Sequence, residues 1–571
     1  MAMGLTQLAR KNNMRARNGI ILLIGLVLVG CGGGGGGGGG TTTPPVGSGS
    51  DTTPPAVLST NPPNTAVGSS LTALQVTFSE PVNPNSVTVG SFVVTGPNGP
   101  VSGVVSVNGA VATFTPSAAL PFGTDFQARI TTAIRDTAGN QLSADYVWRF
   151  NTGKQLALSL DDGNHTCARL VDGRVKCWGL NVYGQLGVGD TTTRGDGPNE
   201  MGANLPAVDL GNGRTAVQIV AGRDHVCARL DNLQVKCWGK GSVLGLAGGS
   251  RGDAPNEMGD NLPAVDLGSG RIALELVAGG EHNCARLDNG RVKCWGNGIA
   301  LGLGDPNTRG DTVGEMGDAL PTLNLGVNRT AVALYAGWSH TCAKLDNAEV
   351  KCWGYNGSGQ LGTGDINVYG TTPQTVPANV PALDLGTGRS VVTMALGGQH
   401  SCALLDNGLV KCWGENGWGQ LGIGDTADRG DGPGEMGDNL PVVNLGTGRT
   451  VVDVAAGYFH NCALLDNGDL KCWGFQGATG QLGYGATYPG NSVGDNPSVM
   501  GDALIAVNVG SNLKALEVIG GMSHTCARLD NGQIKCWGLN GSGQLGLGDT
   551  VTRGDQIAEM GDNLPAVDLG Q

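Results

Sequence analysis

The stretch "HNCARLDNGRVKCWG", residues 282–296, decides how this chain folds, because close copies of it recur from about residue 154 to the end. It holds a histidine, a cysteine two residues later and a second cysteine ten residues after the first. Asp288-Asn289-Gly290 is a turn sequence between two apolar runs, and Gly290 suits the left-handed position of a three-residue hairpin loop. The stretch therefore predicts a β-hairpin in which Cys284 lies opposite Cys294.

The facing cysteines predict a disulfide staple. Cross-strand neighbours have Cβ atoms within disulfide range, and an eleven-residue loop gives about 3 kcal/mol of stabilisation from chain entropy. Zinc and free thiols are the alternatives: His282, Cys284 and Cys294 share a strand face, but no fourth ligand recurs. The predicted pairs are Cys167–Cys177, Cys227–Cys237, Cys284–Cys294, Cys342–Cys352, Cys402–Cys412, Cys462–Cys472 and Cys526–Cys536.

The copies recur at the period of a propeller or a solenoid. Steps between the first cysteines of successive pairs are 60, 57, 58, 60, 60 and 64 residues, and each unit has four strand-length apolar runs such as "LPAVDLG", "TAVQIVAG", "HVCARL" and "VKCWG". The first unit lacks a preceding "PAVDLG" run, whereas the chain ends on one. Seven copies of each strand exist only if Pro565–Gly570 completes the first blade. Residues 154–571 are therefore predicted to form a seven-bladed β-propeller with velcro closure, which leaves no open edge.

The repeats "AGRDHVCARLDN…VKCWG", "NVYGQLGVGD" and "NGSGQLGLGD" resemble those of the regulator of chromosome condensation family. The resemblance covers residues 155–571 and implies a seven-bladed propeller that serves as a binding platform. The eukaryotic founder of that family exchanges nucleotide on a small GTPase and docks on chromatin, and other members are secreted bacterial proteins, including an inhibitor of β-lactamase. We expect the fold and the use of its faces to carry over, with a nucleotide-exchange-like activity the less favoured expectation.

The N-terminus predicts export and lipid anchoring. A basic segment leads into "GIILLIGLVLVGC", an apolar run too short and too close to the start for a good membrane-spanning helix. "LVGC" resembles the lipobox of bacterial lipoproteins, which implies cleavage after residue 30 and acylation of Cys31. A plain secretory signal is the alternative. Residues 1–30 are thus a lipoprotein signal and 31–53 a Gly/Thr/Pro-rich tether. Gly32, where such proteins carry aspartate for inner-membrane retention, points to the outer membrane or cell surface.

Residues 54–153 predict a β-sandwich. Short alternating runs such as "ALQVTFSEPV" and "YVWRFNT" are separated by turn residues. "DTTPP", "FSEPV" and "DTAGN" resemble bacterial Ig-like domains, which serve as spacers in surface proteins. Glu80 and Asp136 are expected to be solvated loop carboxylates, with a calcium site as the alternative. The whole chain is predicted to be all-β.

Charge and motif content exclude several functions. The formal net charge is −13, and −17 without the first thirty residues, which argues against nucleic acid as a partner. No Ser-His-Asp set, phosphate loop or helix-borne metal motif is present, and all seven histidines occupy the same slot in the repeat. We therefore predict no enzyme, no cofactor and no metal. The histidines are expected to be structural hydrogen-bond partners near the blade ends, and the tryptophan after each second cysteine is expected to pack between blades.

"RGD" occurs five times but belongs to a longer repeat, "GDTTTRGDGPNEMGDNLP", which favours a structural role over cell adhesion. Asp196 is expected to cap a turn and Arg194 to pair with a neighbouring blade.

A unique site should break the repeat, and the dipeptide before each histidine varies most. Reading round the ring it is Gly163-Asn164, Arg223-Asp224, Gly280-Glu281, Trp338-Ser339, Gly398-Gln399, Tyr458-Phe459 and Met522-Ser523. Trp338, Tyr458, Phe459 and Met522 should gather on one rim as a candidate binding surface, while Trp418 and Tyr355 fall in another loop class. Scattered loop aromatics are the alternative.

The sequence predicts a lipid-anchored cell-envelope protein whose propeller binds another protein. Polysaccharide binding or cleavage is the second hypothesis, and a purely structural envelope component is the third.

Overall fold

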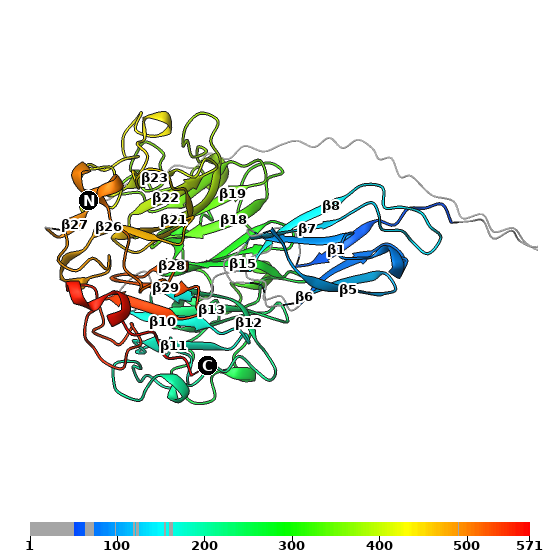
Figure 1. Cartoon of the computed structure of the whole chain (residues 1–571), viewed down its shortest axis with the longest axis horizontal. Coiled ribbons are helices and arrows are strands. Elements are labelled where there is room, and N and C mark those ends of the chain that lie inside the picture. The colour runs from blue at the N-terminus through cyan, green and yellow to red at the C-terminus, as the bar shows by residue number, and fades with distance from the viewer. Residues whose placement is uncertain are drawn as a thin grey trace, which may run out of the picture. The chain divides into compact units, whose positions relative to one another are not determined.

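The computed structural model describes residues 51–62, 73–96, 99–117, 120, 125–152, 156–158, 164–488 and 490–570 (Figure 1). Within these ranges the regular structure is β-strands and single-turn 3-10 helices, as the all-β prediction requires. None of the helices in this part of the chain is long and apolar enough to cross a bilayer. The lipobox and Cys31 lie outside the described residues.

The first domain is a sandwich of two four-stranded antiparallel sheets, with strand orders β1-β2-β6-β5 and β4-β3-β7-β8. Alternation places Leu74, Val76 and Phe78 of β2 in the core, where they meet aromatic side chains of the other sheet such as Trp148. Its strands are β1 (Val57–Asn61), β2 (Leu74–Phe78), β3 (Phe92–Gly96), β4 (Gly99–Pro100), β5 (Gly103–Asn108), β6 (Val111–Pro116), β7 (Asp125–Ile130) and β8 (Tyr146–Asn151), with the 3-10 turn η1 (Pro84–Ser86). The predicted Ig-like sandwich is confirmed.

The second domain has seven antiparallel sheets, one for each copy of the repeat. The inner strands are β9 (Leu156–Leu158), β12 (Ala216–Ala221), β15 (Ala273–Ala278), β18 (Ala331–Ala336), β21 (Val391–Leu396), β24 (Val451–Ala456) and β28 (Ala515–Gly520). The middle strands are β10 (His165–Arg169), β13 (His225–Leu230), β16 (His282–Leu287), β19 (His340–Leu345), β22 (His400–Leu405), β25 (His460–Leu465) and β29 (His524–Leu529). The outer strands are β11 (Val175–Gly179), β14 (Val235–Gly239), β17 (Val292–Gly296), β20 (Val350–Gly354), β23 (Val410–Gly414), β26 (Leu470–Phe475) and β30 (Ile534–Gly538).

The "PAVDLG" run, predicted as the fourth strand, is not a regular strand. It hydrogen-bonds to the outer strand once, as in Val208 N to Val175 O at 2.8 Å. At the opposite, histidine end of the sheet, a residue of the loop after "CWG" forms a one-residue bridge with the outer strand, as Arg309 does with Gly296, and in blade six this loop forms a two-residue strand, β27 (Ser492–Val493). A 3-10 turn precedes each "PAVDLG" run: η2 (Gly202–Asn204), η4 (Gly259–Asn261), η6 (Gly317–Ala319), η7 (Pro377–Asn379), η8 (Gly437–Asn439), η11 (Gly501–Ala503) and η13 (Gly561–Asn563). The remaining turns are η3 (Gly241–Val243), η5 (Gly298–Ala300), η9 (Gly477–Thr479), η10 (Pro497–Val499) and η12 (Ile557–Glu559).

The ring is closed, with the final run in a different place from the predicted one. Val567 N donates to Ile534 O at 2.8 Å, so Pro565–Gly570 lies along β30 and belongs to blade seven. It closes the ring from there, because Gly202 N of blade one bonds Asp568 O and Lys176 Nζ bonds Leu569 O. Strands β28 and β9 are in contact, and the first and last blades lie side by side (Figure 1). The seven-bladed closed propeller is confirmed, and the assignment of this run to blade one is corrected.

The hairpin that decided the fold has the predicted geometry. His282 pairs with Gly296 and Cys284 with Cys294, and Gly290 closes the loop with φ +72° and a bond from its N–H to Leu287 O. Every predicted cysteine pair is bonded, with Cα–Cα separations of 4.0–4.1 Å. Because the thiols bond each other, the zinc and free-thiol alternatives do not describe this protein.

Candidate functional site

The histidines form a hydrogen-bonded belt that joins one blade to the next. His282 Nε2 lies 2.8 Å from Thr341 Oγ1, and Thr341 in turn donates to Ala300 O at 3.1 Å. Trp353 Nε1 donates to the same carbonyl at 3.0 Å. Equivalent histidine bonds join His225 to Asn283, His340 to Ser401, His400 to Asn461, His460 to Thr525 and His524 to Thr166. Six junctions between blades, including the one from blade seven to blade one, thus carry a histidine bond, which confirms the structural role predicted for these residues.

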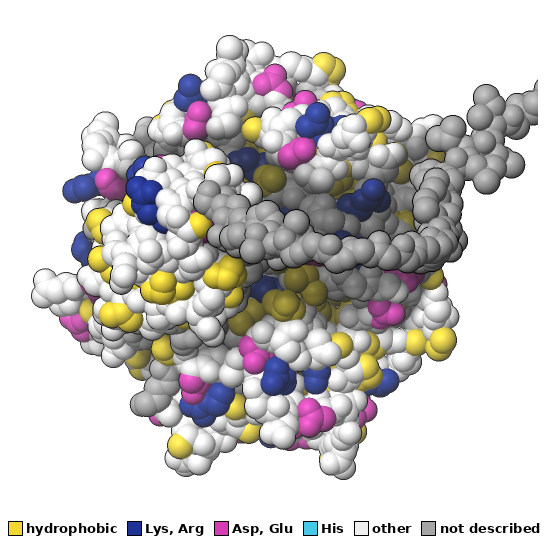
Figure 2. Space-filling view, turned by 90° about the vertical axis from the view of Figure 1, so that its right-hand side faces the viewer, with side chains coloured by type: hydrophobic (Ala, Val, Ile, Leu, Met, Phe, Trp, Pro, Cys, Tyr) yellow, Lys and Arg dark blue, Asp and Glu magenta, His cyan; other side chains and the backbone are white. Residues whose placement is uncertain are grey.

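Burial keeps the belt histidines neutral. Each histidine side chain is at most 1% exposed, and no histidine is visible on the face shown in Figure 2. Desolvation lowers the pKa of His225 and His400 to about 4, and it lowers that of His282, His340, His460 and His524 to about 3. The seven tryptophans after the second cysteines are fully buried, as predicted. The repeated residues are therefore committed to the scaffold.

The RGD loops are scaffold too, with partners that differ from the predicted ones. Arg194 pairs with Asp190 of its own loop at 2.7 Å instead of a neighbouring blade, and its side chain is 19% exposed. The turn is capped by Glu200, whose Oε2 accepts from the N–H groups of Gly195 and Gly197, and Asp196 does not supply this cap. A four-residue loop contact costs less chain entropy than a contact between blades, which explains the local pairing.

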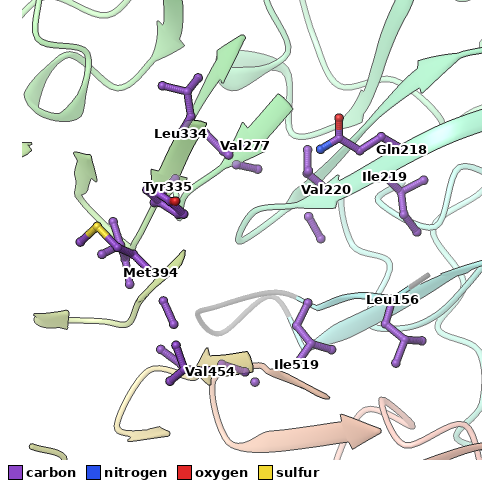
Figure 3. Close-up of a pocket in the computed structure, with 18 residues that line it drawn as sticks. Leu156, Gln218, Ile219, Val220, Val277, Leu334, Tyr335, Met394, Val454 and Ile519 are labelled. Atoms are coloured by element: carbon purple, nitrogen blue, oxygen red, sulfur yellow. The ribbon is translucent and has the colours of Figure 1, made fainter. Parts of the chain in front are cut away.

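The axial cavity is lined by the inner strands of all seven blades (Figure 3). It measures about 260 Å³, and its walls are mainly aliphatic, with Leu156, Val277, Met394 and Ile519 among them. The amide of Gln218 is committed to both backbone groups of Leu276 in the next blade, at 2.8 and 3.0 Å. None of the described lining residues is an acid or a histidine, so the described part of the cavity wall offers no pair of carboxylates of the kind that a polysaccharide-cleaving centre uses.

Sequence variation is concentrated instead on the face at the histidine end. The second residue of each variable dipeptide accepts a backbone hydrogen bond from the residue that follows "CWG", as in Tyr355 N to Ser339 O at 2.9 Å. Each blade thus presents a variable triplet, and we call the ring of triplets the variable face. The described second and third members are Asn164/Leu180, Asp224/Lys240, Glu281/Asn297, Ser339/Tyr355, Gln399/Glu415, Phe459/Phe475 and Ser523/Leu539. Of the third members, the sequence singled out only Tyr355 and placed it in another loop class, whereas its bond to Ser339 O makes it part of the triplet of blade four.

One sector of the variable face is aromatic. Trp338 and Tyr458 meet at a ring-centroid distance of 5.4 Å, and Tyr458 meets Phe459 at 4.4 Å. Phe475 joins Phe459 at 6.3 Å and Trp418 at 4.8 Å. We call these five residues the aromatic ledge. Three of the four predicted rim residues are in it, while Met522 is half-buried in the corresponding loop of blade seven.

The ledge contacts depend on small residues in two other places: Gly398 in blade five, between the blades of Trp338 and Tyr458, and Gly280 in blade three, which precedes the blade of Trp338. A Cβ at Gly398 would lie 2.8 Å from the Tyr458 ring, and a Cβ at Gly280 would collide with Trp338. Tyr458 is 8% exposed and supports the others, while Trp418 is 38% exposed. Trp418, which the sequence placed in a separate loop class, therefore belongs to the same surface.

The neighbouring sector, from blades two and three, is charged. Lys240 Nζ bonds Glu281 Oε1 at 2.8 Å and lies 3.9 Å from Asp224, and Arg223 Nε lies 3.5 Å from Asp224. Partial burial opposes ionisation of Glu281, but the bond to Lys240 and its charge outweigh burial and lower the pKa of this carboxyl. Two cations and two anions therefore balance in this sector.

A carboxylate cluster lies in the sandwich domain. Oxygens of Glu80 and Asp136 lie within 4.8 Å of each other. Asp136 is fully buried, contrary to the expectation that it is solvated, and it accepts from Gly139 N at 2.6 Å and from Asn140 Nδ2 at 2.7 Å. This carboxylate fixes its own turn, a structural role that does not depend on an ion.

These features define the protein as a disulfide-stapled seven-bladed β-propeller with one variable face, preceded by an Ig-like sandwich. The model for the regulator of chromosome condensation (RCC1) repeat matches residues 163–185, 275–298, 331–360, 391–420, 451–481 and 519–544, and a second model of that repeat matches 349–404 and 407–464. The model for the bacterial Ig-like domain matches residues 51–152. The chain therefore carries these repeats and this domain.

Among curated relatives, the ultraviolet-B receptor UVR8 of Arabidopsis thaliana is 29% identical over 395 residues, which are 68% of this chain and 78% of the receptor. Human HERC2, an E3 ubiquitin-protein ligase, is 28% identical over 66% of this chain but only 7% of its own length. Among solved structures, human WBSCR16 aligns over 68% of this chain and 92% of its own, with 18% identity and a TM-score of 0.49. Yeast Prp20 bound to Kap60 aligns over 69% and 83%, with 19% identity and a TM-score of 0.48.

Proposed function

We propose that this chain is a binding protein of the cell envelope that holds a protein partner on the aromatic ledge of its variable face. The observation that carries the proposal is the contact chain from Trp338 through Tyr458, Phe459 and Phe475 to Trp418. Aromatic residues are 5% of this sequence, so five in one contact chain form a marked concentration. Buried aromatic anchors within a polar surround are typical of the centres of protein interfaces.

The scaffold under the ledge supports this proposal. A disulfide fixes the hairpin of each blade, and the histidine bonds join neighbouring blades, so the ledge side chains lose little freedom when a partner binds. The formal net charge of −13 gives no support for nucleic acid as the partner. We propose no catalysis. Since HERC2 extends far beyond the aligned part, we carry no ligase activity to this chain.

Anchoring through an acylated Cys31, in the outer membrane or at the cell surface, is part of the proposal. It rests on the "LVGC" resemblance and on the seven disulfides, which suit an oxidising compartment. Metabolic labelling with a palmitate analogue tests it: wild-type protein should incorporate the label, and Cys31→Ser should not. Equal labelling of the two proteins would contradict the anchor.

Affinity capture from the native envelope, followed by mass spectrometry, tests the binding function. The wild type and a Phe459→Ala/Trp418→Ala double variant are compared, with Tyr146→Ala in the sandwich domain as the aromatic control. A partner retained by the wild type and the control but lost by the double variant is expected. Equal recovery of every captured protein by all three baits would refute the ledge as the binding site.

A further inference from the structure

A small pocket lies where the charged sector meets the aromatic ledge. It measures about 170 Å³ and is lined by the variable positions of blades two, three and four together with the loop after β17. Its walls are Arg223, Glu281, Asn297, Ile299, Trp338 and Ser339, above the buried His282. Three consecutive blades thus contribute their non-repeated residues to a single concavity.

The repeat is broken at this place in the backbone as well. From the glycine of "CWG" to the bridging arginine the chain takes 15 residues in blades one, five and seven, but 12 in blade two and 13 in blade three. In the long loops an asparagine ties the loop, as Asn181 does through Asp190 O at 2.8 Å and Leu186 N at 3.0 Å. Blades two and three replace that arrangement with the short turns η3 and η5, and η5 supplies part of the pocket wall.

The chemistry of the walls fits a neutral, hydroxyl-rich ring. Trp338 supplies an apolar face. Around it, the guanidinium of Arg223, the carboxylate of Glu281, the amide of Asn297 and the hydroxyl of Ser339 supply hydrogen-bond donors and acceptors. The charges of Arg223 and Lys240 are balanced by Asp224 and Glu281, so the site offers no net charge to an ion. His282 beneath has its pKa lowered to about 3 by burial and adds no charge near neutral pH.

The pocket residues are held in place by neighbours outside it. Lys240 fixes Glu281 at 2.8 Å, and Tyr458 backs the ring of Trp338 at 5.4 Å. Gly280 leaves the space in which Trp338 lies, since a Cβ there would collide with the indole. Such pre-organisation lowers the entropic cost of binding. The volume is below the roughly 300–1,000 Å³ of pockets for drug-sized ligands, which limits the occupant to one ring.

We propose that this pocket binds one neutral saccharide unit, with the C–H face of the sugar ring against Trp338 and its hydroxyls paired with Arg223, Glu281 and Asn297. The site goes beyond the proposed protein-binding function, because Phe459 and Trp418, whose replacement tests that function, do not line it. Either proposal can therefore fail without the other.

Saturation-transfer NMR on the full-length protein in detergent tests the site. The probes are the methyl glycosides of glucose, galactose, mannose and N-acetylglucosamine, with glucuronic acid as the charged counterpart. We expect at least one neutral glycoside to receive saturation from the wild type. Its affinity should be about tenfold weaker in Glu281→Gln, the effect of losing one hydrogen bond to a charged group.

Two variants serve as controls. Gln399→Ala alters the same slot in blade five, outside the pocket, and should bind the glycoside as the wild type does. Gly280→Ala removes no pocket side chain but displaces Trp338, and should weaken binding as Glu281→Gln does. Absence of transfer to all four neutral glycosides, stronger transfer to glucuronic acid, or equal affinity in Glu281→Gln and Gln399→Ala would each overturn the proposal.

Discussion

Replacing one belt histidine should reduce the acid sensitivity of the propeller by a calculable amount. His282 is buried, and its pKa falls from 6.5 to about 3 on folding. The folded pKa lies below the unfolded one, so the unfolded chain binds more protons and the free energy of unfolding decreases as the pH falls from about 6.5 towards 3. At pH 5.5 the unfolded histidine is mostly protonated and the folded one is neutral, which lowers the free energy of unfolding by about 1.4 kcal/mol per histidine.

The same linkage acts at six described histidines, His225, His282, His340, His400, His460 and His524. Together they should remove about 8 kcal/mol between pH 7.5 and 5.5, which is comparable to the whole stability of a typical domain. We therefore expect the native protein to lose stability steeply over this interval, well above the range in which most carboxylates titrate.

The assay is urea unfolding at pH 7.5 and 5.5 with disulfides intact, followed by tryptophan fluorescence. His282→Gln should lose about 1.4 kcal/mol less than the wild type between the two pH values. Thr341→Val removes the partner of the His282 bond but leaves the histidine to titrate, so it should shift stability equally at both pH values. If His282→Gln keeps the full pH dependence of the wild type, the buried histidines are not the source of the acid sensitivity.

Three further predictions concern stability. Ala348 closes its hairpin at φ +69°, where blade three has glycine, so Ala348→Gly should stabilise the propeller by about 1 kcal/mol in urea titrations. Gly532 closes its hairpin at φ +84° with no atom near its Cβ, so Gly532→Ala should destabilise the propeller by a similar amount. A destabilising Ala348→Gly or a stabilising Gly532→Ala would contradict the hairpin geometry. Glu275 forms a buried pair with Arg286 at 2.8 Å, so Glu275→Ala should cost about 3–5 kcal/mol by the same measurement, and a change below 1 kcal/mol would contradict it. Thiol titration of the native, unreduced propeller should find none of its fourteen cysteines reactive, whereas fourteen reactive thiols would show that the seven disulfides do not form.

The hairpin and the blade count could be predicted because local rules fix them. The turn at Gly290 sets the register, and the register places Cys284 opposite Cys294. The place of the final run could not be predicted in the same way. In a cyclic repeat each "PAVDLG" run has a blade before it and a blade after it, and the apolar pattern does not tell them apart. Only the hydrogen bond from Val567 to Ile534 assigns the run to blade seven.

The sequence predicted where the candidate site lies but not all of the residues that form it. The rule that function breaks the repeat led to Trp338 and Tyr458, which come from alternate blades and meet because Gly398 between them has no side chain. Phe475 was missed because it comes directly after "CWG" in the sequence, where it is indistinguishable from one more residue of the outer strand. Its partnership with Phe459 comes from the cross-strand hydrogen bond that joins the two loops, which the dipeptides alone do not reveal.

We propose that the repeated residues build the scaffold and that the variable face binds the partner. Hydrogen–deuterium exchange of the propeller, with and without its captured partner, tests this most directly. We expect new protection in the loops that hold Trp338, Tyr458–Phe459 and Phe475, with little change in the "PAVDLG" runs at the other end of the blades. Protection confined to those runs, or to the sandwich domain, would contradict it.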